Sequence, residues 1–542
     1  MPTLDWIGKK AVLNHHREVP YRLLQCDSSL SIGNSDAGNL LVHGDNLAAL
    51  KALLPYYAGK VKCIYIDPPY NTGNKDWSYN DNVSGPEIHE WLNKTVGGEG
   101  EDLTRHDKWL CMMYPRLSLL KEFLSIDGII AVSIDDNELN NMGILLDEIF
   151  GPKNRLACAP WLAEPSGGKE KTGLRGGHEY IFLYHNGDDS NISREIRSSG
   201  DLNLKDKWGK YRKGRELRKW GGTSRRSDRP GQWFPLSAPD GTEVWPIRND
   251  GQEGHWRWGK EQLMKPILED TERAHWELRP FDDGVTWQGK RERWVPYEKI
   301  RDPKKSIGWS TWLDSYGFNA DATRELKEIF GQKIFDTPKP SALIRWIVSL
   351  HADDDAIVLD SFAGSGTTGH AVLQLNNEDG GNRKFILVEM EENICRNVTA
   401  VRLERVIKGY GKQNGLGSGF KFCTLAEPLF DEKGHIHKKV TFPALAAHVF
   451  FTETGQPIPK RVMGKTPLLG VYNGTAVYLL FNGILGDKQP SGGNVLTNEI
   501  LLNLPAYDGA KVIYGAACRL SPQRLKRENI NFRQTPYEIR TR

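Results

Sequence analysis

The sequence lacks the long apolar runs that a membrane-spanning helix needs. No stretch approaches the roughly 20 apolar residues that cross a bilayer, and the mean hydropathy of the chain is -0.53. Its first residues, Met1-Pro2-Thr3-Leu4-Asp5, do not show the basic and then apolar pattern of a secretory signal. We therefore expect a soluble, cytoplasmic protein that makes no membrane contact.

Cysteine is also scarce, with seven residues among 542. They are odd in number, and no two stand at the Cys-x-x-Cys spacing of redox pairs and zinc sites. The absence of this motif excludes a Cys-x-x-Cys redox pair or zinc site. We expect no metal site and mostly buried free thiols.

The length of the chain predicts two or three domains, because one hydrophobic core rarely organises 542 residues. Short β-rich runs alternate with helical patterns in the first part, which predicts a parallel sheet covered by helices. A covering helix is expected at residues 116–124. The expected strands are residues 39–42, 61–66, 128–134 and 180–184.

This alternation is interrupted from about residue 186 to residue 330, where Gly, Pro, Arg and Trp dominate. It returns with a helix at 342–350 and strands at 356–359 and 385–389. A smaller α+β region is expected from about residue 425. The predicted fold is therefore one α/β sheet with an insert, divided as 1–185 and 331–424 for the sheet, 186–330 for the inserted domain and 425–542 for the C-terminal region.

A glycine-rich turn follows the predicted strand at 356–359 and leads into a helical pattern. A turn of this kind brings backbone amides and a helix N-terminus close to a ligand at the carboxyl edge of a sheet. Gly364, Gly366 and Gly369 also satisfy the dinucleotide fingerprint, with Glu389 where a ribose-binding acid belongs. Taken alone, the turn leaves a methyl donor, a dinucleotide and a purely structural role open. Its sequence is Asp360-Ser361-Phe362-Ala363-Gly364-Ser365-Gly366-Thr367-Thr368-Gly369.

A second motif decides between these alternatives. The buried-type strand at 61–66 ends in Asp67-Pro68-Pro69-Tyr70, followed by Asn71-Thr72-Gly73. Two prolines stiffen the backbone and remove two amide donors, which leaves acceptors beside a carboxylate and an aromatic ring. These acceptors suit the amine of adenine. The amine would donate one hydrogen to Asp67 and one to the Pro68 carbonyl, with Tyr70 stacked on the adenine ring. A Pro-Pro turn with a surface acid is the alternative for this motif by itself.

Together the two motifs resemble the amino-methyltransferase signature of DNA modification enzymes. Their order along the chain, with an insert between them, resembles the permuted β class of these enzymes. Ser361 stands where that family usually has proline, and residues 93–106 look like additional sequence. The finer likeness is to the modification subunit of type III restriction-modification systems, and it rests on residues 43–47, 64–73, 132–138, 337–340 and 531–538.

The resemblance implies a Rossmann-like, permuted sheet that binds S-adenosylmethionine. For catalysis it points to Asp67, Pro68, Pro69 and Tyr70. Asp45 would contact the adenine amine of the cofactor, and Glu389 its ribose hydroxyls. Thr367 and Lys339 would lie near the cofactor's carboxylate. The methionine end would lie against Asp360, Phe362, Gly364 and Gly366.

The implied activity is transfer of a methyl group to N6 of an adenine flipped out of double-stranded DNA. The implied partners are a second copy of the chain and a helicase-nuclease restriction subunit. Cytosine N4 is a chemically close alternative, but the acid at Asp67 favours adenine, because such cytosine enzymes more often carry serine there. A NAD-dependent enzyme would leave residues 67–70 unexplained, and a vestigial DNA-binding subunit disagrees with intact Asp67, Tyr70 and Gly364.

Basic side chains cluster in the expected insert, although the net charge of the chain is only +3. Such a run would contact phosphates in a salt-dependent way, and some arginines would fork onto guanine edges. A solvated charged loop around a small tryptophan core is the alternative, so we assign DNA contact to the segment and not to single residues. The basic cluster consists of Lys205, Lys207, Lys210, Arg212, Lys213, Arg215, Arg218, Lys219, Arg225, Arg226 and Arg229.

Overall fold

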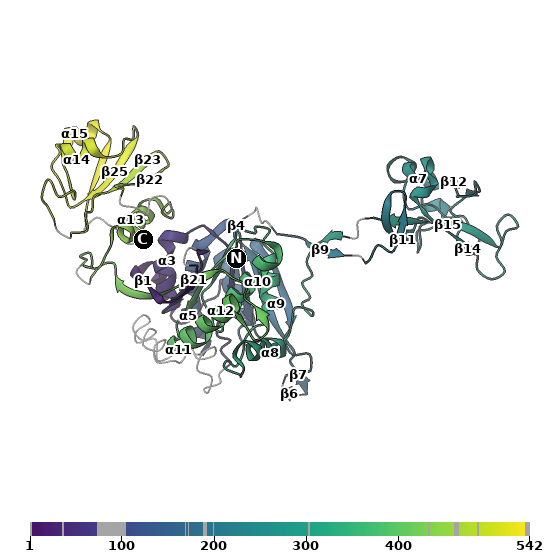
Figure 1. The fold of residues 1–542 in the computed structure, drawn as a ribbon, viewed down its shortest axis with the longest axis horizontal. Coiled ribbons are helices and arrows are strands. Elements are labelled where there is room, and N and C mark those ends of the chain that lie inside the picture. Colours follow the sequence, from purple (N-terminus) through teal and green to yellow (C-terminus); the bar gives the residue numbers. More distant parts are fainter. Residues whose placement is uncertain are drawn as a thin grey trace. The chain divides into compact units, whose positions relative to one another are not determined.

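The chain forms two compact units in the computed structural model (Figure 1). The larger unit combines Met1–Ser193 with Ser310–Arg542, and the smaller unit is Arg194–Trp309. Gly73, most of the additional stretch 93–106, and Tyr537 and Glu538 lie outside the described residues. The structure describes residues 3–34, 37–72, 105–168, 170–171, 173–187, 192–198, 200–301, 304–431, 434–459, 466–484 and 487–536.

A nine-stranded sheet forms the centre of the larger unit, in the order β1-β21-β2-β18-β17-β3-β4-β8-β5. The six neighbouring strands from β21 to β4 run parallel, whereas β1, β8 and β5 pair antiparallel. In that order the strands are Arg22–Gly33, Gly419–Pro428, Leu40–His43, Lys384–Glu389, Ile357–Asp360, Val61–Ile66, Leu124–Ile134, His178–His185 and Arg155–Leu162.

The order of the sheet confirms the predicted permuted α/β fold. Strands β3 and β17 are neighbours, with Val358 opposite Cys63 and Leu359 opposite Ile64. In the chain, however, the whole smaller unit lies between them. The strand that precedes the Asp-Pro-Pro-Tyr motif and the strand that precedes the glycine-rich turn therefore end side by side.

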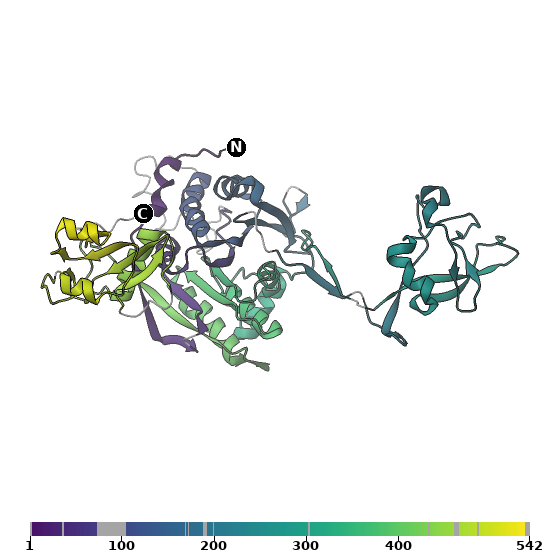
Figure 2. The same ribbon diagram turned by 90° about the horizontal axis from the view of Figure 1, so that it is seen from above.

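Two groups of helices cover the two faces of this sheet, and Figure 2 shows blue helices on one side and teal-to-green helices on the other. In the first group, α3 packs against α5 and α13, and α5 packs against α6. In the second, α10 packs against α9 and α12, and α12 packs against α8. The first group is α3 (Asn46–Tyr57), α5 (Arg105–Phe123), α6 (Leu139–Phe150) and α13 (Phe442–Thr454). The second is α8 (Asn319–Phe330), α9 (Ser341–Ser349), α10 (Thr367–Asp379) and α12 (Ala400–Lys408).

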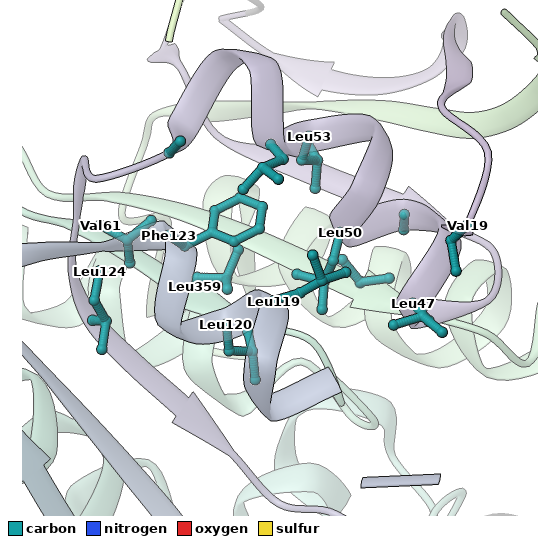
Figure 3. Close-up of a cluster of buried hydrophobic side chains, with 14 of the residues drawn as sticks. Val19, Leu47, Leu50, Leu53, Val61, Leu119, Leu120, Phe123, Leu124 and Leu359 are labelled. Carbon is teal, nitrogen blue, oxygen red and sulfur yellow. The ribbon is translucent and has the colours of Figure 1, made fainter. Parts of the chain in front are cut away.

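The core beneath α3 and α5 consists of tightly buried aliphatic side chains around Phe123 (Figure 3). Burying one such side chain stabilises the fold by about 1.5–3 kcal/mol. These contacts hold the start of α3 at the carboxyl edge of the sheet, next to the end of β2. The cluster includes Leu47, Leu50 and Leu53 of α3, Leu119 and Leu120 of α5, and Val61 and Leu359 of the sheet.

The smaller unit is built on a four-stranded antiparallel sheet with its own hydrophobic core. Its core includes Leu217, Phe234, Leu236, Trp256 and Met264, and its strands, in sheet order, are β10 (Leu204–Asp206), β11 (Gly209–Glu216), β15 (Glu292–Ile300) and β14 (His275–Pro280). The chain enters through β9 (Glu195–Ser198) and leaves through β16 (Lys304–Ile307), which pair with each other. This unit is shorter than the segment 186–330 expected from the sequence, because α8 belongs to the larger unit.

The C-terminal region carries a second sheet, in the order β22-β23-β25-β27. Strands β23, β25 and β27 run parallel, and α13 packs between this sheet and α3. The strands are Leu468–Tyr472, Thr475–Leu479, Ala510–Gly515 and Ile530–Gln534, and the accompanying helices are α14 (Asn498–Asn503) and α15 (Pro522–Arg527).

The cysteines depart from the expected mostly buried thiols. Cys26 and Cys423 stand directly opposite each other in the antiparallel pair β1 and β21, and they form a disulfide. Cys158 is exposed, whereas Cys63, Cys111 and Cys395 are buried thiols. Among the described residues no helix is long and apolar enough to cross a membrane, and no group of three potential metal ligands is found.

Candidate active site

Four acidic side chains lie at the carboxyl edge of four neighbouring parallel strands. Asp45 follows β2, Glu389 ends β18, Asp360 ends β17 and Asp67 follows β3. In the strand register Glu389 lies opposite His43, and Asp360 lies opposite Leu387. The other three acids therefore lie within about two residues of Glu389 along the strand direction. The edge of a parallel α/β sheet is where such folds bind ligands.

A fifth acid, Glu179, reaches the same edge from a strand of opposite direction. Strand β8 runs antiparallel to β4, and Tyr180 near its start pairs with Ile134 at the end of β4. The second residue of β8 therefore lies beside the ends of the parallel strands. Glu179 was not predicted from the sequence, because an acid at the start of a strand shows no pattern that marks it as functional.

Asp67 is the centre of a buried polar network. Lys339 Nζ lies 2.9 Å from Asp67 Oδ1 and 2.8 Å from Oδ2, and the Tyr70 hydroxyl donates to Oδ1 at 2.8 Å. The Tyr70 oxygen also lies 2.9 Å from Glu179 Oε2, and Lys339 Nζ lies 3.4 Å from the same Glu179 atom. The Lys339 ammonium is 4.9 Å from the centre of the Tyr70 ring.

Burial and nearby charges determine the protonation states of Lys339 and Tyr70. Burial by itself would lower the pKa of Lys339, but the negative charges of Asp67 and Glu179 outweigh it and raise that pKa. Burial, followed by the same two carboxylates, raises the pKa of the Tyr70 phenol well above its ordinary value. Lys339 therefore stays an ammonium and Tyr70 a neutral phenol near neutral pH.

Hydrogen bonds from other parts of the chain hold the backbone of the Asp-Pro-Pro-Tyr motif and the residue that follows it. Pro68 and Pro69 are buried, and the Trp109 indole nitrogen donates to the Pro69 carbonyl at 2.6 Å. Asn71 adopts a left-handed conformation with φ 56°, and its amide donates to Glu138 Oε1 at 2.5 Å. No role was predicted for Trp109 or Glu138, since their contacts to this motif come from residues distant in the sequence.

The glycine-rich turn folds around Asp360 and Glu389. Gly366 has φ 78° and Gly364 has φ 49°, a left-handed region that favours glycine. The Phe362 amide donates to Asp360 Oδ1 at 2.9 Å, and the Gly364 amide donates to Glu389 Oε2 at 2.8 Å. The Phe362 and Gly364 amides of the turn thus donate to Asp360 at the end of β17 and to Glu389 at the end of β18.

A buried arginine supports this turn from α12. Arg402 donates to Thr367 Oγ1 at 2.8 Å and to Ser365 Oγ at 3.1 Å, and it pairs with Glu325 at 3.2 Å. Thr367 in turn donates to the Lys339 carbonyl at 3.2 Å. The position of Lys339 is therefore coupled to the glycine-rich turn through one hydroxyl group.

Asp45 is the N-cap of α3 and accepts a hydrogen bond from the Ala48 amide at 2.9 Å. The buried Arg116 guanidinium lies 3.1 Å from its other oxygen and also donates to Asn46. Asn46 reaches the Ser361 carbonyl at 3.3 Å, which joins this corner to the glycine-rich turn. The Ser361 hydroxyl is buried and has no hydrogen-bond partner among the described residues.

The acids at this edge fit S-adenosylmethionine, which carries a cationic amine, two ribose hydroxyls and an adenine amine. Burial raises the pKa of Asp360 to about 7, although hydrogen bonds from Thr368 and the Phe362 amide lower it, and the charge of Asp67 adds a smaller increase. An ammonium group of a ligand would relieve that desolvation. Both Glu389 oxygens accept backbone amides, from Gly364 and Glu391, and a carboxylate oxygen can accept more than one hydrogen bond.

Comparison with known proteins agrees with this site. Residues 61–401 match the model of a family described as DNA methylase, the N6 and N4 methyltransferases. The EcoPI Mod subunit of a type III restriction-modification enzyme from Escherichia phage P1 is 30% identical over 504 residues, which are 83% of this chain and 74% of that protein.

Two further relatives are similar over shorter stretches. The type II methyltransferase M.KpnI from Klebsiella pneumoniae is 35% identical over 371 residues, 66% of this chain and 82% of that protein. The StyLTI Mod subunit from Salmonella typhimurium is 32% identical over 418 residues, 73% of this chain and 59% of that protein. The matched segment contains both motifs of the site, and the chain belongs to the DNA methylase family of N6 and N4 methyltransferases.

Proposed function

We propose that this protein methylates N6 of a specific adenine in double-stranded DNA and is the modification subunit of a restriction-modification system. The observation that carries the proposal is the buried Asp67 at the end of β3, directly beside the glycine-rich turn at the end of β17. An acceptor for the target amine and a binding turn for the methyl donor thus share one sheet edge. The Mod subunits and the type II methyltransferase among the relatives support it.

In the proposed mechanism the protein aligns the amine rather than forming a covalent bond. Asp67 and the Pro68 carbonyl accept the two hydrogens of the adenine amine, so that its lone pair points at the methyl group. Tyr70 stacks on the flipped base, which is worth roughly 1–3 kcal/mol against the cost of flipping. Asp67 then takes the proton that the methylated amine releases.

S-adenosylmethionine supplies an electrophilic methyl group in this reaction. We propose that Asp360 binds its ammonium, Glu389 its ribose hydroxyls and Asp45 its adenine amine. Phe362, Gly364, Gly366 and Thr367 line the methionine end. The expected contact of Lys339 with the cofactor carboxylate would require its ammonium to leave Asp67, so we place Lys339 at the base side of the site.

We propose that the smaller unit reads the DNA. Four cations of the basic cluster are neutralised by acids within the unit, namely Lys207, Lys213, Arg218 and Arg226. The other seven make no ion pair with any described residue and so remain available to phosphates. They are Lys205, Lys210, Arg212, Arg215, Lys219, Arg225 and Arg229.

DNA is the substrate, and two protein partners are proposed. As a Mod-like subunit, the chain would form a homodimer and assemble with a helicase-nuclease subunit. Light scattering across micromolar concentrations tests the first of these. A monomer that still methylates DNA would remove the homodimer from the proposal.

The central experiment is methyl transfer from labelled S-adenosylmethionine to plasmid DNA, followed by digestion to nucleosides. We expect N6-methyladenine at one short sequence, which long-read sequencing of the same DNA would define. N4-methylcytosine as the labelled product would support the cytosine alternative instead. A thermal shift with S-adenosylhomocysteine and none with NAD would exclude the dinucleotide alternative.

A further inference from the structure

The carboxylate of Asp67 is nearly saturated with donors before any substrate arrives. Oδ1 accepts from both Lys339 and Tyr70, and Oδ2 accepts from Lys339. A carboxylate oxygen offers about two acceptor positions. Asp67 in this state offers few acceptor positions to a new amine, although the proposed function needs it to accept one amine hydrogen.

Glu179 is the second acceptor within reach of the same two donors. Its Oε2 atom lies 2.9 Å from the Tyr70 oxygen and 3.4 Å from Lys339 Nζ. The single phenol proton of Tyr70 cannot be donated to Asp67 and Glu179 at the same time. Lys339 would need to move by about 0.5 Å to make a full hydrogen bond to Glu179.

We propose that Glu179 is a positioning residue that takes over Lys339 and Tyr70 from Asp67 when the target amine arrives. The inference rests on the proposed function and deepens it, because it explains how Asp67 becomes free to accept the amine. Two donor groups move from one carboxylate to the other, and no covalent bond changes. Glu179 acts through Lys339 and Tyr70, and it does not itself contact the base.

The ammonium of Lys339 is buried, and only 8% of its side chain is exposed. A buried charge that loses its partner is strongly destabilising. If Asp67 were the single carboxylate in reach, its release would leave Lys339 unpaired. With Glu179 on the other side, the ammonium stays paired throughout the exchange, and the cost of freeing Asp67 falls.

The test compares two substitutions that separate charge from shape. Glu179→Gln keeps the length of the side chain but removes the charge that receives Lys339, whereas Glu179→Asp keeps the charge on a shorter side chain. Single-turnover methylation is measured at saturating DNA and S-adenosylmethionine. We expect the Gln variant to be slower by roughly tenfold or more, and the Asp variant to be clearly faster than the Gln variant.

A role in packing alone gives the reverse order, since Gln fills the site and Asp leaves a gap. Equal rates for the two variants, or a Gln variant as fast as the unchanged enzyme, overturn the proposal. Glu404→Gln and Glu404→Asp are the matched controls, because Glu404 pairs with Lys408 on the surface of α12. An unchanged enzyme that methylates no DNA would instead refute the proposed function.

A structure of the unchanged enzyme with its target duplex and an unreactive donor analogue gives a second readout that does not depend on variant folding. We expect Lys339 Nζ at hydrogen-bond distance from Glu179 and an Asp67 oxygen bonded to the adenine amine. A Lys339 that still bridges both Asp67 oxygens beside the bound amine would overturn the inference.

Discussion

Lys339 and Asp67 form a buried ion pair, with the ammonium nitrogen 2.9 and 2.8 Å from the two carboxylate oxygens. In the chain 272 residues separate the two, and each lies in a different part of the larger unit. The pair therefore exists only after both parts of the sheet have assembled. Stability and the proposed chemistry depend on the same contact.

Replacement of Asp67 tests both aspects of this contact. We expect Asp67→Ala to abolish methyl transfer while its affinity for S-adenosylhomocysteine stays unchanged. The free energy of unfolding should also fall, by less than the ~3–5 kcal/mol typical of a broken buried pair, because Glu179 remains near Lys339. Urea unfolding measures the loss, and adding Lys339→Met should recover stability without activity. A rate above a few per cent of the unchanged enzyme would contradict the role of Asp67.

Asp360 predicts a specific dependence of stability on pH. Its pKa is about 7 in the folded protein and 3.8 as an ordinary aspartate, so folding takes up a proton between these values. Stability from this group is therefore lost as pH rises from about 4 to about 7, by at most about 4 kcal/mol. Asp360→Asn lacks this loss.

The difference in melting temperature between Asp360→Asn and the unchanged protein should thus grow from about pH 5 to about pH 7. The variant should also bind S-adenosylhomocysteine more weakly, because the charge for the ammonium is gone. Asp283→Asn, at an exposed position of the smaller unit, is the control. Melting curves of the two proteins that run parallel across this pH range would exclude a raised pKa.

The ion pairs within the smaller unit predict which arginines control the dependence of DNA binding on salt. Arg225 and Arg229 are exposed and make no ion pair with any described residue, whereas Arg226 pairs with Glu253 at 2.9 Å. Each lost phosphate contact should lower the slope of log K against log salt by about 0.9. Replacing either Arg225 or Arg229 with Gln should therefore change the slope more than replacing Arg226 with Gln.

Affinity for the methyl donor should not change in these variants. Fluorescence anisotropy of a labelled duplex at several salt concentrations measures the slope, and Arg527→Gln on α15 is a control for the loss of an exposed cation. Variants that keep the slope of the unchanged protein but lose donor binding would place this segment in the catalytic part of the protein.

Gly369 predicts a packing defect rather than a defect in ligand contact. A Cβ atom on Gly369 would lie 2.7 Å from the Leu403 Cδ2 atom, and Leu403 is fully buried in α12. We expect Gly369→Ala to reduce stability by about 1–3 kcal/mol, as measured by urea unfolding. Gly231→Ala, which meets nothing within 4 Å, should be nearly neutral. An Ala variant of normal stability would show that α10 and α12 can separate without cost.

The sequence predicted five of the six parallel strands of the sheet, because each of these is a short, buried apolar run. Residues 61–66 coincide with β3, and 385–389 with β18 except for one residue. The helix expected at 116–124 covers only the end of α5, which starts at Arg105 and includes Pro115. A proline inside a helical pattern argues against continuing it, and Leu124 opens β4 instead.

The edge strand β1 and its neighbour β21 were not predicted, because their antiparallel pairing depends on contacts between distant segments. Much of β1 is exposed and polar, so alternation within the strand gives no signal. In the candidate site, the motifs indicated all four acids that the structure brings to one edge. Glu179, Arg116 and Arg402 were missed for a different reason, since each is defined only by its partners in space.

The antiparallel pair of β9 and β16 places the entrance and the exit of the smaller unit on adjacent strands. A segment bounded in this way can be replaced by another of different length without changing the strand order of the central sheet. If the smaller unit reads the DNA as proposed, exchange of this segment between related genes would change the recognition sequence and leave the methyltransferase site unchanged.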